Sequence, residues 1–370
     1  MNPSLLNHLQ LDPQSGVPLI SQLTEQLTWL IASGELKDGV QLPPMRQLAE
    51  EVGVHMHTVR QAYQRLEVDG LVSIRTRRGT VVLPYDPAAV AGRGAENPSY
   101  LIGIIMPSPA SFYTPFIKTI QEKCRDLRYL PLFCYTFENP SLVESYYKQL
   151  TARQVDGFIF VSIGPASLVE DPQLLDLLPP IVSVDVPDMP GYQVQLDSEG
   201  AANQLTRHLI DHGYRRIGLI TPPLEWPNVM SFYQGYQKAL MGIDAAPIPE
   251  LVSQVEGFFS QHGQQGAEVL IGLDDLPDAI LAASDSLALG ALEAIHEQGF
   301  SVPEDIAIVG YNDIPAASLV TPGLTTAAVP AARMGELALE MLQELIAGRN
   351  PSQKSLTIPT ELIIRQSCGC

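Results

Sequence analysis

Charge, aromatic residues and long apolar runs are all scarce in this chain of 370 residues. Charged residues make up 17% and aromatic residues 7%, against 45% hydrophobic residues, which is a globular rather than a disordered composition. No apolar run reaches the ~18 residues that a membrane-spanning helix requires, so we expect no membrane contact. The N-terminal segment lacks a basic start, a long apolar centre and a small-residue cleavage site, which predicts a cytoplasmic protein.

Cysteine is equally rare, and the four cysteines are Cys124, Cys134, Cys368 and Cys370. In a long chain without an export signal they are expected to be reduced thiols, which excludes a disulfide scaffold. Cys368 and Cys370 flank a single glycine and could form a redox or metal pair. A tetrahedral metal site needs four ligands, and no partner pair is visible in the sequence, so we expect neither a metal nor a cofactor.

Basic residues are outnumbered, with 22 Lys and Arg against 41 Asp and Glu and a net charge of −19. This balance opposes DNA binding, because contacts to phosphate dominate its affinity. The distribution is uneven, however: residues 1–83 hold 7 basic and 8 acidic residues, a net charge of −1, so the remainder carries −18. Residues 71–83 contain three arginines and no acid. An acidic body with a small basic edge predicts weak, salt-sensitive nonspecific binding to DNA.

The first 83 residues have the pattern of a winged helix-turn-helix. Apolar residues at 3.6-residue spacing predict a first helix, a second is expected over 42–53 with prolines in its first turn, and a third over 54–68. The inward face of the third helix is Val59, Ala62, Tyr63 and Leu66. Two short helices across a glycine turn would place the later one in the major groove of DNA. Strands over 71–74 and 80–83 around a basic tip complete a wing.

The motifs LPPMRQLAEEVGV, HTVRQAYQRLEVDGLV and the RGT of the wing resemble the GntR-type winged-helix headpiece over residues 18–83. The resemblance implies that Arg46, Thr58 and Arg60 contact DNA. Two departures stand out: His55 and Met56 replace the usual Ser/Asn-Arg pair, and the wing does not read Gly-x-Gly. Base readout would then rest on His55, His57 and Arg60.

The wing arginines would contact phosphates or enter the minor groove; they are Arg75, Arg77 and Arg78. Other interpretations remain open. His55 and His57 could be plain surface residues, and Arg46 could be an ordinary solvated helix charge. Residues 84–99, rich in proline, glycine and alanine, are expected to be a mobile linker.

From residue 100 onward, short apolar strands alternate with helices, which predicts parallel sheets covered on both faces. The loops after such strands face the ligand site. Those loops carry hydroxyl, carboxylate, amide and aromatic side chains: Ser108, Phe112, Tyr113, Ser162, Asp185, Ser284, Asp285 and Asn312. Such a set suits a neutral polyhydroxylated ligand. Asp285 could instead cap the helix that follows it, and Phe112 and Tyr113 could belong to the core.

The segments QVDGFIFVSI, IVSVDVPD, AILAASDSLALGALEAIHEQGF and ELIIRQS resemble the LacI/GalR-type sensor core, with further matches in order along about 270 residues. The resemblance implies a two-lobed, periplasmic-binding-protein-like type I core, an α/β fold of parallel sheets flanked by helices. Lobe 1 would comprise about 100–196 plus 324–350, and lobe 2 about 197–323 plus 351–370. The implied effector contacts are the eight residues above and, with less regular loop lengths, Phe259.

Phe232 is the largest departure from that family, whose members usually carry an arginine there. The pocket thereby loses a forked donor and gains apolar surface, so Phe232 joins the expected effector contacts. A sugar is the first expectation for the effector. A deoxysugar, a modified sugar, a nucleoside, an amino-acid-like compound or a small apolar metabolite stays open.

A GntR-type headpiece on this core resembles the chimeric arabinose-responsive repressors. The expected function is a homodimeric, DNA-binding repressor of carbohydrate genes, with double-stranded operator DNA and a small-molecule effector as partners. A cytoplasmic binding protein without DNA is the distant alternative, against which the headpiece argues. Enzyme activity is not expected, because the sequence has no catalytic motif such as G-x-S-x-G or H-E-x-x-H at a strand–helix turn.

Overall fold

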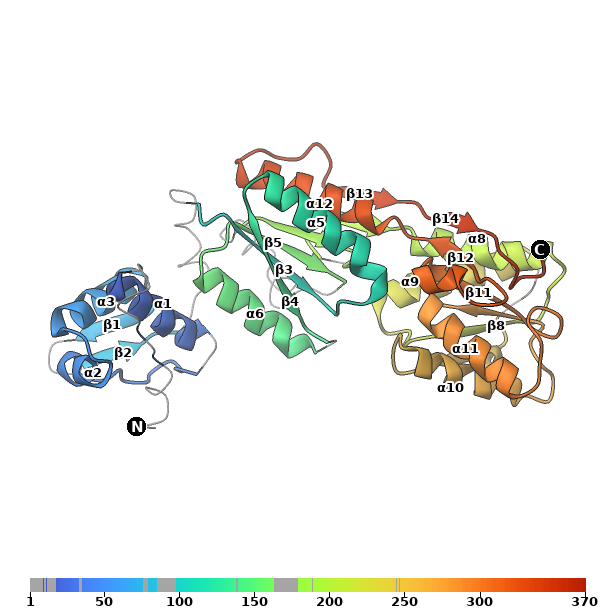
Figure 1. The fold of residues 1–370 in the computed structure, drawn as a ribbon, viewed down its shortest axis with the longest axis horizontal. Helices are drawn as coiled ribbons and strands as arrows, with labels where there is room; N and C mark the ends of the chain where they lie inside the picture. The colour runs from blue at the N-terminus through green and yellow to red at the C-terminus, as the bar shows by residue number, and fades with distance from the viewer. Residues whose placement is uncertain are drawn as a thin grey trace.

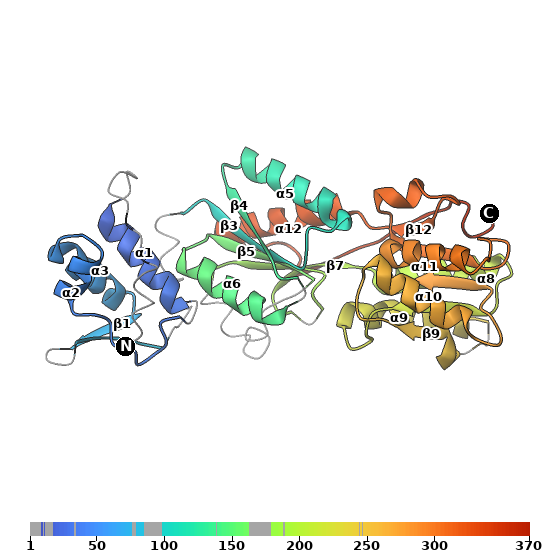
Figure 2. The same cartoon turned by 60° about the horizontal axis from the view of Figure 1, so that its bottom comes forward.

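A computed structural model describes residues 9, 11, 18–32, 35–75, 79–84, 98–137, 139–162, 179–187, 189–243, 245 and 247–370. Three bodies follow one another along the molecule: the headpiece, a first lobe and a second lobe (Figures 1 and 2). Within the described ranges, no helix combines the length and the apolar character needed to cross a bilayer.

The headpiece has the expected three helices and a two-stranded wing. Its elements are α1 (Leu19–Ala32), α2 (Met45–Glu51), α3 (Met56–Val68), β1 (Val72–Arg75) and β2 (Gly79–Val82). The predicted inward face of α3 is confirmed, since its four residues are fully buried and the Tyr63 hydroxyl donates a 2.9 Å hydrogen bond to the Pro43 carbonyl. The second helix is shorter than predicted: Pro44 stays in extended backbone, so α2 begins after the prolines.

Lobe 1 is built on a six-stranded, all-parallel sheet in the order β13-β7-β6-β5-β3-β4. Its strands are β3 (Leu101–Met106), β4 (Leu130–Tyr135), β5 (Gly157–Val161), β6 (Ile181–Val184), β7 (Tyr192–Leu196) and β13 (Ser355–Ile358). Its helices are α5 (Thr114–Asp126), α6 (Pro140–Ala152) and α12 (Ala331–Ile346). Successive residues of β3 alternate between two cores, with Ile104 packed beside α5 and α12 and Ile105 beside α6. Burial on both faces explains why these strands are continuous apolar runs.

Lobe 2 repeats the arrangement in the order β14-β12-β11-β10-β8-β9, with only β14 antiparallel. Its strands are β8 (Ile217–Thr221), β9 (Val252–Gln254), β10 (Ala279–Ala282), β11 (Ala307–Asn312), β12 (Thr325–Ala328) and β14 (Glu361–Ile363). Its helices are α8 (Ser198–Asp211), α9 (Pro227–Met241), α10 (Ser260–Ile271) and α11 (Asp285–Glu297). Helices α10 and α11 pack so closely that a Cβ on Gly290 would overlap the carbonyl oxygen of Ser260.

The chain passes between the lobes after β7, after β12 and after β13. The division of the C-terminal segments therefore differs from the one predicted. Residues 325–328 pair within the lobe 2 sheet rather than in lobe 1, and residues 355–358 pair with β7 in lobe 1 rather than in lobe 2. Short strands such as TTAA and SLTI carry no local signal of the sheet they will join, because their partners are distant in the sequence.

Candidate DNA-reading surface and effector site

The amino-terminal end of α3 presents the predicted DNA-reading residues to solvent. His55, His57 and Arg60 are exposed, and Thr58 is half-buried. His55 occupies the N-cap position in extended backbone, but its side chain makes no capping bond. The imidazole is therefore not committed to its own helix and can contact a base edge or a phosphate.

The other residues predicted to contact DNA are held less uniformly. Arg46 on α2 is 85% exposed in its side chain and lies 3.2 Å from Glu50, one turn away. Exposed pairs of this kind stabilise little, so DNA phosphate can replace Glu50. Arg75, at the end of β1, is exposed and approaches the Ser73 hydroxyl at 3.4 Å. Arg77 and Arg78 lie outside the described residues.

In lobe 1, three predicted effector residues come together after the strands. Tyr113 ends the short helix η2 (Ser111–Tyr113), and its hydroxyl shares a 2.9 Å hydrogen bond with the Ser162 hydroxyl after β5. The Phe112 ring lies 4.7 Å from the Tyr113 ring. Ser108, after β3, is half-buried nearby in the chain. Hydroxyl groups and aromatic faces are thus combined at one end of the sheet.

Asp185 follows β6 and connects lobe 1 to lobe 2. Burial raises the pKa of Asp185 to about 6. The backbone N–H of Leu196 and the side chain of Asn228, in the first turn of α9, oppose that shift, so both are close to the carboxyl group. A carboxyl group that interacts with a residue of the other lobe is placed to respond to a ligand bound between the lobes.

Lobe 2 contributes an aromatic pair opposite these groups. The Phe232 ring on α9 lies 5.2 Å from the Tyr311 ring near the end of β11, and both side chains are buried. The Tyr311 hydroxyl is 3.4 Å from that of Ser198. Burial and then the charge of Asp185 raise the pKa of Tyr311, so the electrostatic effect of the lobe 1 carboxylate extends to this ring.

Sequence reasoning missed Tyr311, Asn228 and Ser198. Tyr311 adjoins the predicted Asn312 in β11, and this position was the available signal. Asn228 lies in the first turn of α9 rather than in a loop after a strand. Ser198 is the first residue of α8, which Asp197 caps by accepting from the Gly200 N–H at 2.8 Å.

Two other predicted contacts have structural partners within lobe 2. Ser284 caps α11 by accepting from the Leu287 N–H at 3.2 Å, so the cap is Ser284 and not Asp285. Asp285 is fully buried, and its two oxygens accept from the Thr326 hydroxyl at 2.6 Å and the Ile314 N–H at 2.7 Å. This carboxylate holds the loop that follows β11, and the half-buried Asn312, with φ 116°, is the last residue of that strand.

Phe259 is not brought into the cluster. It is 57% exposed at the start of α10, and its ring lies 5.8 Å from that of His262. The neighbouring Phe258 instead faces Trp226, the residue that precedes α9, at 6.0 Å.

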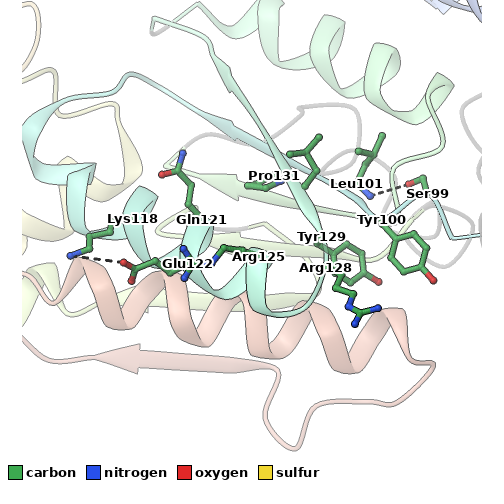
Figure 3. Close-up of a pocket in the computed structure, with 11 residues that line it drawn as sticks. Ser99, Tyr100, Leu101, Lys118, Gln121, Glu122, Arg125, Arg128, Tyr129 and Pro131 are labelled. Atoms are coloured by element: carbon green, nitrogen blue, oxygen red, sulfur yellow. Dashed lines mark hydrogen bonds and ion pairs between the residues drawn. The ribbon is translucent and has the colours of Figure 1, made fainter. Parts of the chain in front are cut away.

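A depression on the outside of lobe 1 is distinct from the cluster of predicted effector residues. It is lined mainly by α5 and the start of β4, including Lys118, Arg125, Arg128 and Tyr129 (Figure 3). The strand residues that line it, Leu101 and Pro131, belong to the amino ends of β3 and β4. Ligands of parallel sheets sit at the carboxyl ends, so this depression is not the effector site.

These features define a class of protein in which a DNA-reading headpiece is joined to a two-lobed binding core. Residues 19–82 match the model of bacterial regulatory proteins of the gntR family, and residues 206–368 match that of the periplasmic binding protein-like domain. The HTH-type transcriptional repressor PurR of Mannheimia succiniciproducens is 31% identical, over 77% of this chain and 86% of that protein.

Solved structures agree. A regulatory protein of the LacI family from Chloroflexus aggregans is 26% identical with a TM-score of 0.65, over 73% of this chain and 98% of that one. The transcription regulator GntR from Chromobacterium violaceum is 28% identical with a TM-score of 0.66, over 72% and 99%. The chain belongs to the LacI/GalR-type family of DNA-binding transcription regulators, with a GntR-type headpiece in front of its ligand-binding core.

Proposed function

We propose that this protein is an operator-binding repressor, active as a homodimer, whose DNA affinity is set by a small molecule held between the lobes. The observation that carries the proposal is the position of Asp185 at the end of β6, where its pKa responds to Asn228 of lobe 2. A ligand that takes the place of Asn228 beside this carboxyl group favours one separation of the lobes over another. It can change DNA affinity only through that difference.

The effector we infer is a purine base or nucleoside. Aromatic rings from both lobes, Phe112 and Tyr113 on one and Phe232 and Tyr311 on the other, offer flat apolar faces for a planar ring. Asp185 accepts from ring or exocyclic N–H groups, and Asn228 offers both a donor and an acceptor. The relatives at about 30% sequence identity are named PurR, and that name favours the same class of effector.

A sugar or sugar derivative is the second candidate. The Asp185 carboxylate and the Ser162 hydroxyl beside Tyr113 are suited to sugar hydroxyls, and an aromatic face can cover sugar C–H groups. Phe232 argues against a sugar. Its ring stands where the resemblance to the family implies an arginine, and the forked donor of that arginine is therefore missing. The two classes therefore differ in whether stacking or hydroxyl recognition dominates.

A thermal-shift screen of the full-length protein against purine bases, nucleosides, pentoses and hexoses tests these proposals. A true effector at 100 times its dissociation constant should add about 2.7 kcal/mol to stability. Each hit is then added to the protein on labelled DNA, and binding is followed by fluorescence anisotropy. Stabilisation by bases but not by sugars supports the purine proposal. A hit that leaves DNA affinity unchanged contradicts regulation through the lobes.

The dimer makes a geometric demand on the operator. Two headpieces related by a twofold axis need half-sites one helical turn or a multiple apart, about 34 to 36 Å per turn. Light scattering on the purified protein measures the assembly directly. A strictly monomeric protein that still binds one half-site would remove the dimer from the proposal and leave the effector assignment standing.

A further inference from the structure

The C-terminal end of the chain lies beside α8, the helix that leads into lobe 2 (Figure 1). Cys368, Gly369 and Cys370 pack against the last turn of that helix, where His208 and His212 are four residues apart and therefore on one face. No partner pair for the two cysteines is visible in the sequence. The structure supplies one, because α8 and the chain end are 160 residues apart in sequence but adjacent in space.

Three ligand atoms converge at this point, those of His208, His212 and Cys370, which all lie within 4.8 Å of one another, and the Cys368 sulfur adjoins this group. The Cys368 sulfur lies 3.3 Å from His208 Nε2, and the Cys370 sulfur lies 3.3 Å from the same nitrogen and 3.0 Å from His212 Nε2. Ligands at ~2.3 Å (sulfur) and ~2.0 Å (nitrogen) from a tetrahedral zinc ion are ~3.5 Å apart. These three of the four sulfur–nitrogen pairs are within about half an ångström of that spacing. The fourth pair, Cys368 with His212, is wider, because Cys368 lies outside the group of mutually close ligand atoms, so the Cys368 sulfur would move toward His212 around an ion. The two sulfurs, 2.7 Å apart, would separate by about 1 Å around an ion.

The surrounding groups orient these ligands. His212 Nδ1 lies 2.8 Å from the His208 carbonyl oxygen, so its N–H donates there and Nε2 is left with a free lone pair toward Cys370. The Thr325 hydroxyl donates to the Cys368 sulfur at 3.1 Å, and the Tyr214 hydroxyl donates to the Cys368 carbonyl at 3.1 Å. Such outer contacts are typical of metal ligands.

Gly369 makes the turn that brings both cysteines to one side. Its φ is +82°, a left-handed conformation that glycine adopts without strain. A Cβ there would also lie 2.9 Å from the Tyr214 oxygen. The CGC sequence is thus fitted to this place in the fold, with Cys368 buried in the protein and Cys370 exposed at the end.

We propose that His208, His212, Cys368 and Cys370 form a tetrahedral Cys2His2 site for Zn²⁺ that fastens the chain end to α8. Nitrogen and sulfur ligands in tetrahedral array select zinc over the hard cations Mg²⁺ and Ca²⁺. On binding, the two thiols release their protons to solvent and both sulfurs coordinate as thiolates. The exposed His212 and Cys370 leave the ion an entry path from solvent.

The zinc site is separate from the effector site. The opposite end of the 14-residue α8 carries Ser198, which contacts Tyr311, and a helix of that length spans about 20 Å. The proposal therefore does not depend on the effector. Its role is structural, since the ion would join the last residues of the chain to the helix that supports lobe 2.

Zinc titration of the chelator-treated, reduced full-length protein tests the proposal. One equivalent of Zn²⁺ should bind in competition with a chromophoric chelator and raise the melting temperature by several degrees. Co²⁺ in place of zinc should give sulfur-to-metal charge-transfer absorption and the visible bands of a tetrahedral ion. Absence of one-to-one binding, or cobalt spectra without a thiolate band, would overturn the site.

Variants then assign the ligands. C370S and H212A each remove one proposed ligand at an exposed position. Each variant is expected to bind Zn²⁺ more than about 100-fold more weakly than wild type, a larger loss than removal of a group that only hydrogen-bonds a ligand would cause. H296A, at an exposed histidine of α11, and C134S, at a half-buried cysteine of β4, should bind as wild type. Unchanged zinc affinity in both ligand variants contradicts the assignment. So does mass-spectrometric detection of a Cys368–Cys370 disulfide that persists in reductant and prevents zinc uptake.

Discussion

The side chain of Asn228 in lobe 2 lowers the pKa of Asp185 in lobe 1. The interaction joins the end of β6 to the first turn of α9, so it depends on how close the two lobes are. Under the proposed function, a bound effector either keeps this interaction or replaces it with donors of its own, and the Asp185–Asn228 pair then couples effector binding to lobe separation.

We expect effector affinity to fall as the pH decreases below about 6. Burial raises the pKa of Asp185 to about 6 in the free protein, and an effector that donates to the carboxylate lowers it again. Binding then releases protons in the window below about 6, so affinity is complete above this value and is lost as the carboxyl becomes protonated. Calorimetric titration between about pH 5 and 7.5 measures the effect.

D185N should remove the pH dependence and weaken effector binding about tenfold or more, the contribution of a charge-assisted hydrogen bond. D126N changes an exposed carboxylate on α5 and serves as the matched control, with wild-type affinity and pH profile. Affinity that increases toward low pH would show instead that the effector accepts a proton from Asp185.

Effector binding should change the fluorescence of one of the two tryptophans and not the other. Trp226 precedes α9, two residues before Asn228, and its ring lies 6.0 Å from that of Phe258. Trp29 belongs to the headpiece and donates from Nε1 to Gln149 on α6 at 2.9 Å. W226F should abolish the effector-induced change in emission, and W29F should retain it. The reverse result would place the effector response in the headpiece.

The headpiece was predictable because its signals are local. The apolar spacing that buries Val59, Ala62, Tyr63 and Leu66 follows from the period of a helix, and the wing follows from two short strands around a turn. The start of α2 was predicted three residues too early, since the periodicity does not show that Pro44 remains extended. The continuous apolar strands of both lobes were likewise visible in the sequence.

The candidate site was only partly predictable. The rule that loops after parallel strands face the ligand placed Tyr113, Ser162 and Asp185 together. It could not distinguish Asp285, whose partners on β12 and in the following loop use both oxygens. Nor could it find Asn228 or the histidines beside Cys370. Contacts between distant segments leave no periodic trace in a single sequence.

Asp285 is expected to be a determinant of stability. D285A leaves the buried Thr326 hydroxyl and the Ile314 N–H without a partner, which should lower the free energy of unfolding by about 2 to 4 kcal/mol. Urea denaturation measures this loss. D274A, at an exposed loop carboxylate, should stay within about 0.5 kcal/mol of wild type. T326V should be less than additive with D285A, because the two changes break the same bond.

Arg60 and Arg46 should differ in how they affect DNA binding. R60A, at the exposed face of α3, is expected to weaken binding to a fragment selected from random DNA by about 1 to 3 kcal/mol and to relax its sequence preference. R46A should weaken selected and unrelated DNA alike and reduce the salt slope by about 1. Anisotropy titrations at several salt concentrations separate these two patterns, with R349A on lobe 1 as the neutral control.

The Arg46–Glu50 pair offers a substitution that should strengthen DNA binding rather than weaken it. Glu50 is 3.2 Å from Arg46 and also places a negative charge on the same surface. E50Q should therefore strengthen binding to all DNA by a few fold, since it frees the arginine and removes repulsion from phosphate, while an exposed pair of this kind adds little to stability. In the R46A background the gain from E50Q should shrink. An E50Q gain of the same size with and without Arg46 would show that Glu50 acts by its charge alone, and that Arg46 does not reach the phosphates.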